Sequence, residues 1–187
     1  MIYKESTLSK YLDDLAARVP APGGGSASAL AASVGASLIS MVVNFTLGKP
    51  KYAQYENELK KILEKSEKLR EQFLNLVDLD VVAYKSKNIR DALDVPFMAC
   101  RLCFEGIKLC PPLIKKGNIN LISDVAVAAV LLESAFTAAY FNVEINLKSL
   151  GEKKLTSSVR KELERKAKLI KKIRKQTEVE VGKIIRR

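Results

Sequence analysis

Pro22-Gly-Gly-Gly-Ser26 opens the stretch that decides the fold, and a run of small and apolar residues continues from it to Leu47. Three consecutive glycines before a helix permit unusual backbone angles and the close approach of another group. The helix N-terminus behind them offers free N–H groups and a partial positive charge, which suit an anion. Ser26 is a plausible N-cap of this helix. Taken alone, the glycines favour a tight turn between packed helices over a ligand site.

The uncharged run from Ser26 to Leu47 is long enough to cross a membrane, but its composition favours a buried helix. Seven of its 22 residues carry hydroxyl or amide side chains. Four of these, Ser33, Ser37, Ser40 and Asn44, fall on one stripe at helical spacing. Small residues on such a stripe let helices approach closely. We therefore expect a buried small-residue helix at the centre of the fold and no membrane association.

Apolar residues at helical spacing recur through the rest of the chain, and no segment alternates with the period of two that marks a strand. The sequence therefore predicts an all-α fold: a single domain over residues 1–187, built as an up-and-down bundle of about six helices, several of them long. Besides the helix after the glycines, we expect one capped by Ser6 or Thr7, one from Tyr52 to about Asn88, one from Asp94-Val95-Pro96 to Pro111-Pro112, one from Asn120 to about Leu150 and a basic one from about Thr156.

The positive charge of the chain is concentrated in its last segment, residues 153–187. The whole chain has a net charge of +11, and this segment holds 14 Lys/Arg against 4 Asp/Glu. Such a segment can bind nucleic acid, or it can form an amphipathic bundle helix with a basic outer face. Apolar residues recur every three or four positions from Leu155 to Ile184, and no aromatic residue stands among the charges for base stacking. The bundle helix is favoured, so nucleic acid is not the expected partner.

Acid–base chemistry in this chain has to use Asp, Glu, Lys, Tyr or Cys, because the sequence contains no histidine. Three cysteines give no disulfide framework, which agrees with a reducing cytoplasm, and the first residues lack the apolar core of a signal peptide. Cys100-Arg-Leu-Cys103 has neither the further ligands that zinc needs nor the βαβ context of a redox motif. The cysteines are interpreted as small core residues, and no metal site is expected.

Two aspartates stand beside apolar runs, and either carboxyl group could act as an acid or base. Asp80 follows two leucines and precedes Val-Val-Ala, and burial of this kind raises the pKa of a carboxyl group. Asp124 also borders an apolar run, but at the start of a helix it could simply favour the positive helix end. Lys49, Lys51 and Tyr52 could bind an anionic group or could be ordinary loop residues, with the lysines solvated.

Ordered motifs over nearly the whole chain together resemble the cyclodeaminase domain of formiminotransferase-cyclodeaminase and stand-alone bacterial relatives that act as methenyltetrahydrofolate cyclohydrolases. Each motif is weak alone, whereas their order and spacing are specific. The motifs are Pro22-Gly-Gly-Gly-Ser26, Met41-Val-Val-Asn44-Phe-Thr46, Gly48-Lys-Pro-Lys-Tyr52, Asp80-Val-Val-Ala-Tyr84, Val95-Pro96, Gly117-Asn118-x-Asn120-Leu-x-Ser-Asp124 and Asn142-Val-Glu-Ile-Asn146-Leu.

The resemblance implies an all-helical homodimer that binds a folate between helices or between subunits. It implies one of two reactions: loss of ammonia from 5-formiminotetrahydrofolate to give 5,10-methenyltetrahydrofolate, or hydrolysis of the methenyl compound. No cofactor is implied beyond the tetrahydrofolate derivative that serves as substrate. The aspartate of the family's long third helix matches Asp80, which becomes the expected general acid/base.

By the same resemblance, a wider set of residues is expected to bind the substrate. Asp124 would accept hydrogen bonds from the pterin. The others are the glycine turn (Pro22, Gly23, Gly24, Gly25 and Ser26), the residues that would line the pocket or meet the glutamate tail (Asn44, Lys49, Lys51 and Tyr52), and Asn118.

One departure from the family pattern lies between Asp80 and Pro96, where the 15 intervening residues form a shorter span than family members usually have. Two other functions remain open beside the folate enzyme. One is a non-catalytic helical dimer of the same fold that binds a folate-like anion. The other is a basic helical module for nucleic acid.

Overall fold

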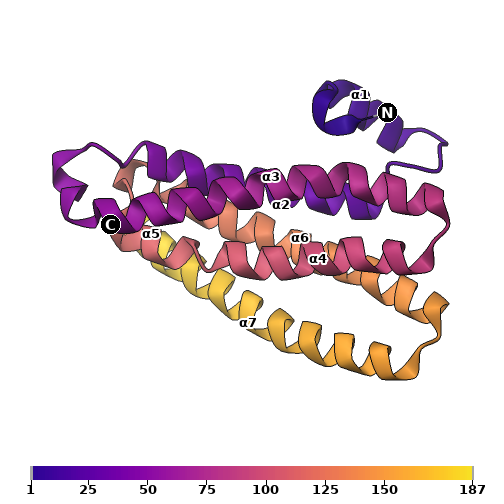
Figure 1. Ribbon diagram of the computed structural model, residues 1–187. Helices are drawn as coiled ribbons and strands as arrows, with labels where there is room; N and C mark the ends of the chain where they lie inside the picture. The colour runs from indigo at the N-terminus through magenta and orange to yellow at the C-terminus, as the bar shows by residue number, and fades with distance from the viewer. Residues whose placement is uncertain (1, 187) are drawn as a thin grey trace.

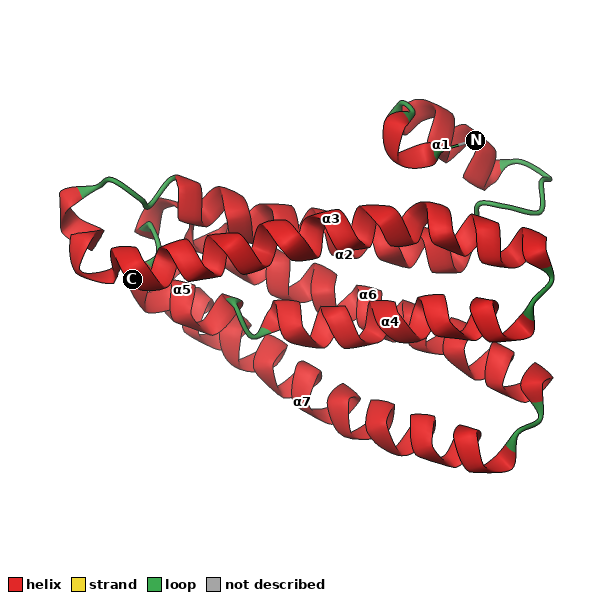
Figure 2. Cartoon of the chain, in the orientation of Figure 1, coloured by secondary structure: helices red, strands yellow, loops and turns green. Residues whose placement is uncertain are grey.

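The computed structural model describes residues 2–186, and this part of the chain contains helices and no strand (Figures 1 and 2). The predicted all-α class is confirmed, and each of the six expected helices is present. A seventh, short helix begins at Cys110 and holds the expected proline pair in its first turn. The α-helices are α1 (Leu8–Ala16), α2 (Gly24–Asn44), α3 (Glu56–Ser86), α4 (Ile89–Ile107), α5 (Cys110–Lys116), α6 (Ile122–Leu150) and α7 (Lys153–Ile185), with 3-10 helices η1 (Tyr3–Glu5), η2 (Pro50–Tyr55) and η3 (Ile119–Leu121).

The long helices run alternately between the two ends of an elongated bundle (Figure 1). At one end lie the start of α2, the end of α3 and the end of α6, and we call this the glycine end. The end of α2, η2 and the start of α6 form the opposite end. Helix α2 packs against both α3 and α6, α4 closes the bundle against α3 and α6, and α7 covers α6. The up-and-down arrangement is therefore as predicted.

Small residues place α2 at the centre of the bundle. Ala32 and Ala36 are fully buried, and a Cβ atom at Gly35 would lie only 3.0 Å from the Leu132 side chain of α6. The serine stripe is satisfied internally: the Ser40 and Ser66 hydroxyls are hydrogen-bonded at 2.8 Å. Gly24–Asn44 and Ile119–Leu150 are both long and apolar enough to cross a membrane. In this fold they pack against each other as core helices, which agrees with the expectation for α2.

Two predicted helix starts are wrong, at Ser26 for α2 and at Asp94 for α4. Ser26 is not the N-cap of α2, because the helix begins at Gly24 with Gly23 as its cap. Helix α4 begins at Ile89, where the Asn88 side chain accepts a hydrogen bond from the Arg90 N–H at 2.9 Å. Proline was therefore misleading as a start signal, since Pro96 lies inside α4.

The bundle tolerates Pro96 because another helix satisfies the carbonyl that this proline cannot bond. A proline inside a helix has no N–H for the carbonyl four residues earlier, which here belongs to Ala92. The Asn146 amide of α6 donates to that oxygen at 2.6 Å. A side chain of α6 thus replaces the missing backbone bond of α4.

The basic terminal helix α7 is a member of the bundle. Its buried residues, among them Val159, Leu163 and Ile170, recur along one face that packs on α6. Three of its charged side chains pair with other helices: Glu162 with Arg101, Arg160 with Glu144 and Arg174 with Glu133. This is the arrangement predicted for an amphipathic bundle helix with a basic outer face.

Candidate active site

Asp80 lies against the N-terminus of α2, although 54 residues separate it from Ser26 in the sequence. It stands in the last two turns of α3, at the glycine end. Its Oδ2 accepts a hydrogen bond from the Ser26 backbone N–H at 2.9 Å. The first N–H groups of a helix have no partner within the helix and carry its positive end. The carboxylate therefore caps α2 from a neighbouring helix.

Glycine at position 25 is required by the closeness of this carboxylate. A Cβ atom there would lie 2.0 Å from Asp80 Oδ1 and 2.6 Å from Asp80 Cγ, which is far inside contact distance. At Gly24 a Cβ would meet the Asn142 amide at 3.5 Å, an ordinary contact, and at Gly23 it would meet nothing within 4 Å. The glycine turn is thus more than a connection between helices, since it makes room for an acidic side chain.

A cavity of about 280 Å³ opens beside Asp80 and the glycine turn. Five segments form its walls: the α1–α2 connection, the start of α2, the end of α3, the start of α4 and the end of α6. Among its lining residues the titratable ones are Asp80 and Tyr84, while α6 contributes two amides. The lining residues are Pro20, Ala21, Gly23, Gly24, Gly25, Asp80, Tyr84, Ala92, Asn142, Ile145 and Asn146.

Burial raises the pKa of the Asp80 carboxyl group above its ordinary value, and the hydrogen bond from the Ser26 N–H opposes that rise. The lining of the cavity contains no lysine or arginine that would favour the charged form. A half-buried carboxyl group with a raised pKa holds a proton more readily than a solvated one and is a candidate proton acceptor and donor. The geometry thus supports acid–base chemistry at Asp80.

Two residues of the predicted turn do not present their side chains to this cavity. Ser26 is fully buried, and its hydroxyl is hydrogen-bonded to the Tyr11 hydroxyl at 3.1 Å. Ser26 contributes its backbone N–H to the site, and Asp80 accepts a hydrogen bond from it. Pro22 is buried after a cis peptide bond and is not among the lining residues. The cavity therefore involves Gly23, Gly24 and Gly25 directly.

The other predicted binding residues lie at the opposite end of the bundle. Gly25 and Asn44 are separated by 19 residues of α2, which at the helical rise corresponds to about 28 Å. The residues found there are Asn44, Lys49, Lys51, Tyr52, Asn118 and Asp124. Within a single chain, these residues therefore lie too far from Asp80 to line its cavity.

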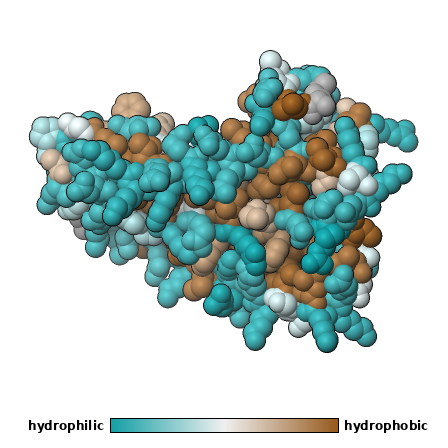
Figure 3. Space-filling view, in the orientation of Figure 1, coloured by the Kyte–Doolittle hydropathy of each residue, from teal (hydrophilic) through white to brown (hydrophobic). Residues whose placement is uncertain are grey.

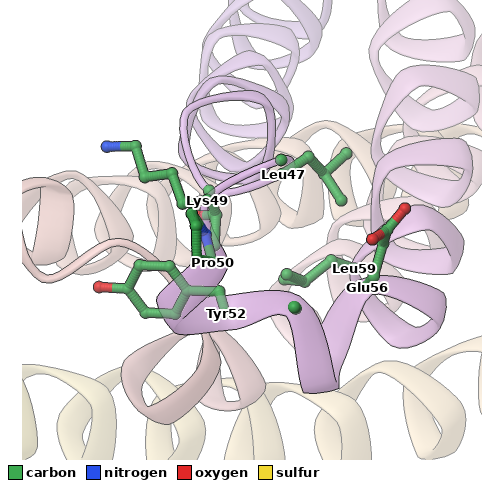
Figure 4. A pocket seen from close by; sticks show the side chains of 9 residues that line it. Leu47, Lys49, Pro50, Tyr52, Glu56 and Leu59 are labelled. Carbon is green, nitrogen blue, oxygen red and sulfur yellow. The ribbon is translucent and has the colours of Figure 1, made fainter.

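Two residues of this opposite end hold its loops together. The Asn118 backbone N–H donates to Thr46 at 2.9 Å and its amide to the Phe45 carbonyl at 3.1 Å. The Tyr52 hydroxyl accepts from the Ile119 N–H at 3.1 Å. Tyr52 also helps to line a small cavity of about 100 Å³ (Figure 4).

The charged residues at this end are more exposed. Lys49 and Lys51 are both exposed, and the Lys49 amine points outward, away from Leu59 and Glu56 (Figure 4). The Lys51 amine lies 5.5 Å from the centre of the Tyr52 ring. Asp124 stands in the first turn of α6, where a negative charge suits the helix end.

The candidate set omitted Asn142, Asn146 and Tyr84, which the structure places at the cavity. A signal for the asparagines exists in the sequence, because residues four apart on a helix share one face. Asn142 and Asn146 have this spacing near the end of an otherwise apolar helix. Tyr84 has the same spacing from Asp80.

Residues 7–88 and 85–165 match the sequence model of the family described as formiminotransferase-cyclodeaminase. The two matched segments meet at the α3–α4 turn, where the shortened span was noted. A methenyltetrahydrofolate cyclohydrolase from Methylorubrum extorquens is 38% identical to this chain, in a match that covers 84% of this chain and 87% of that protein. The formimidoyltransferase-cyclodeaminase of Rattus norvegicus is 28% identical over 79% of this chain, and the match spans 32% of the rat protein.

The fold is also similar to a solved structure over nearly its full length. The crystal structure of a formiminotetrahydrofolate cyclodeaminase from Thermotoga maritima matches with a TM-score of 0.92 and 27% identity, covering 97% of this chain and 98% of that chain. Because nearly all of both chains is covered, neither has a long insertion relative to the other. The short α3–α4 turn is therefore compatible with the fold of this relative. On these similarities, this chain belongs to the formiminotransferase-cyclodeaminase family.

Proposed function

We propose that this protein forms 5,10-methenyltetrahydrofolate from 5-formiminotetrahydrofolate with loss of ammonia, or hydrolyses the methenyl compound, with Asp80 as its general acid/base. The observation that carries the proposal is the half-buried Asp80 carboxyl group, which faces a cavity beside the glycine turn and has a raised pKa. The names of the relatives from Methylorubrum extorquens and Thermotoga maritima support the two reactions in turn.

Both reactions need a group that takes up a proton at one step and returns it at another. In the deamination, N10 attacks the formimino carbon and loses its proton, and the departing nitrogen must gain a proton to leave as ammonia. In the hydrolysis, water loses one proton as it adds to the methenyl carbon, and the ring nitrogen gains a proton as its bond to that carbon breaks. The added hydroxyl then releases its own proton to solvent as the formyl carbonyl forms. A single carboxyl group with a raised pKa can perform both transfers in sequence. The carboxylate form of Asp80 would also attract the positively charged methenyl substrate.

The test follows methenyltetrahydrofolate by its absorbance and measures ammonia released from 5-formiminotetrahydrofolate. The wild type should turn over at least one of these substrates, and Asp80→Asn should lose that activity by at least about a hundredfold, as expected for removal of a general acid/base. Asp13→Asn changes an exposed aspartate of α1 and should retain wild-type activity. Binding of a folate without turnover by the wild type would instead favour the non-catalytic alternative.

We further propose that the protein is a homodimer joined through α2 and α6. An uncharged face runs along both helices, which Gly35 brings side by side near Leu131. Several of its apolar side chains are strongly exposed, and Phe141 is 74% exposed. A long apolar face of this kind marks an interaction site. Its members are Leu30, Ala31, Val34, Leu38, Met41 and Phe45 of α2, and Val127, Val130, Leu131, Ala138, Phe141 and Ile145 of α6.

Such a dimer would bring the two ends of α2 together. A symmetric pair of copies uses the same surface on both partners, and the midpoint of Gly24–Asn44 is Val34. A two-fold axis near Val34 places Asn44 of the partner subunit near Gly24, because residues equidistant from the axis face each other. The exposed Asn44 and Lys49 would then complete the Asp80 cavity across the interface.

Cysteine cross-linking tests this arrangement. Val34→Cys should form an intersubunit disulfide, since a residue near a two-fold axis lies close to its own copy. Ser157→Cys, on the exposed side of α7, should not. Mixing inactive Asp80→Asn with an inactive Asn44→Ala/Lys49→Ala variant should restore about a quarter of wild-type activity, because half of the dimers are mixed and each has one intact site. Absence of the disulfide together with no recovery on mixing would contradict a shared site.

A further inference from the structure

The N-terminal arm, Tyr3–Ala16, is fastened to α3 immediately beside Asp80. The Tyr3 and Lys4 backbone N–H groups donate to the two carboxylate oxygens of Asp78, at 2.6 and 3.3 Å. The arm is braced internally, because the Tyr3 hydroxyl donates to Asp14 at 2.9 Å. Figure 1 shows α1 standing beside α3 near the glycine end, outside the main bundle. The first anchor of the arm is thus two residues from the candidate acid/base.

The second anchor of the arm is Tyr11, which reaches α2. Tyr11 is the buried residue of α1, with 3% of its surface exposed, and its ring meets the Tyr3 ring edge to face with centres 5.4 Å apart. Its hydroxyl is hydrogen-bonded to the Ser26 hydroxyl at 3.1 Å. Ser26 in turn donates its backbone N–H to Asp80 at 2.9 Å. A continuous chain of contacts therefore runs from Asp78 through the arm and Ser26 to Asp80.

We propose that Tyr11 is a positioning residue for Asp80, which it holds in place by fixing Ser26 and the first turn of α2. This inference rests on the proposed function, in which Asp80 exchanges protons with the substrate. Tyr11 does not line the cavity and makes no contact with the substrate space. Its role is carried through Ser26.

The chemistry of serine explains why such a brace is useful. A serine hydroxyl near a helix N-terminus readily bonds to nearby backbone groups and so competes with the regular helix geometry. In this protein the Ser26 hydroxyl is engaged by Tyr11, and the Ser26 N–H is left to Asp80. Few titratable groups lie near Asp80: Asp78 stands two residues earlier on α3, Tyr84 lines the cavity from the same helix, and Tyr11 lies behind Ser26. Helix α6 presents only the uncharged Asn142 and Asn146 amides.

Burial raises the pKa of the Tyr11 hydroxyl, its bond to Ser26 lowers it, and the nearby Asp80 charge raises it further. The net direction is upward, so Tyr11 stays a neutral phenol over the ordinary pH range and can act as a constant brace. Without the Tyr11 hydroxyl, the hydrogen bond from the Ser26 N–H to Asp80 should weaken. Since that hydrogen bond favours the carboxylate form, its weakening should raise the pKa of Asp80.

The experiment is a titration of the Asp80 carboxyl carbon by 13C NMR in wild type, Tyr11→Phe, Ser26→Ala and the double variant. Asp80→Asn identifies the signal. We expect the pKa of Asp80 to rise in both single variants and to rise no further in the double variant, because both changes remove the same hydrogen bond. Tyr3→Phe removes a phenol hydroxyl from the same arm but not the contact with Ser26, and it should leave the titration unchanged.

Kinetics supply a second readout. In Tyr11→Phe, kcat should fall about fivefold, the effect of one lost hydrogen bond, while KM stays within about twofold because the cavity lining is intact. An unchanged Asp80 titration in Tyr11→Phe would overturn the proposal, and so would equal shifts in Tyr3→Phe, which would indicate general loosening of the arm. The NMR titration needs no turnover, so failure of the proposed reaction and failure of this inference are distinguishable.

Discussion

The two ends of α2 carry comparable polar residues but use them in opposite ways. At the glycine end, Asp80 and two asparagines of α6 line a cavity of about 280 Å³. At the opposite end, the side chains of Asn118 and Tyr52 are hydrogen-bonded to the backbone of neighbouring loops, beside a cavity of about 100 Å³. The comparison shows that polar residues in a motif do not by themselves indicate a site. What marks the site is a titratable group that is held in place, partly desolvated and open to a cavity.

The largest effect should follow from filling the space that Gly25 leaves for Asp80. In Gly25→Ala the new Cβ would lie 2.0 Å from Asp80 Oδ1, so the carboxyl group must rotate away and lose the Ser26 N–H. We expect the fold to survive and activity to fall by at least about a hundredfold, as for loss of the acid/base itself. Circular dichroism and the folate assay together would measure this.

Gly24→Ala is the matched control, because it makes the same change one residue earlier and meets Asn142 at an ordinary 3.5 Å. Its loss of activity should be far smaller and should be seen mainly in KM. If Gly24→Ala and Gly25→Ala were equally damaging, the helix start rather than the position of Asp80 would be the cause.

At the opposite end of the bundle, a substitution should change the free energy of unfolding. Asn118→Ala removes the bond to the Phe45 carbonyl and the one that the side chain accepts from the Asn120 N–H. Asn118 is 5% exposed, and two partly buried hydrogen bonds contribute about 2 kcal/mol to the free energy of unfolding. Urea denaturation would measure the loss. Asn120→Ala, an exposed neighbour whose side chain makes neither bond, should cost much less.

A smaller loss is expected where α6 compensates for Pro96 at the glycine end. Asn146→Ala leaves the Ala92 carbonyl without its donor and should lower the free energy of unfolding by about 1 kcal/mol. In a Pro96→Ala background the backbone N–H of residue 96 can bond that carbonyl, so the same Asn146→Ala change should cost close to nothing. A full cost in both backgrounds would show that Asn146 stabilises the bundle in some other way.

The sequence was sufficient for the features that depend on local pattern. The small-residue stripe identified α2 as a core helix, and the apolar positions of residues 153–187 identified α7 as a bundle helix. It failed where a tertiary contact overrides a local signal. The rule that proline starts a helix misplaced α4, because it could not include the Asn146 amide that satisfies Ala92.

The candidate site shows the same limit. Asp80 could be singled out because its neighbours in the chain are apolar, and this anticipated its burial. The resemblance to a family supplied further residues but not their positions in space, so it did not indicate that Asn44 lies about 28 Å along α2 from Gly25, at the opposite end of the bundle from Asp80. Nothing in the local pattern indicated that Tyr11, from a separate short helix, reaches Ser26.

The smallest expected effect is on the free energy of unfolding, and it should have opposite signs at Asp80 and Asp124. The pKa of Asp80 is raised in the folded protein, so the folded state binds this proton more tightly than the unfolded chain does. Stability must then fall as the pH rises from the unfolded pKa, about 3.9, through the folded value. Asp80→Asn carries no such charge, so it should be more stable than wild type at neutral pH, and the difference should disappear in acid.

Asp124 is the matched case at the opposite end, because it lies in the first turn of α6, where the helix dipole favours a negative charge. Asp124→Asn should therefore lose about 0.5 kcal/mol at neutral pH, opposite in sign to Asp80→Asn. Denaturation of Asp80→Asn between about pH 4 and pH 8, and of Asp124→Asn at neutral pH, would measure the two effects. If Asp80→Asn were less stable than wild type at pH 8, the hydrogen bond from the Ser26 N–H would have to stabilise the carboxylate by more than burial destabilises it. Asp80 would then contribute to folding, and would not be a charged group that is kept for chemistry at the expense of stability.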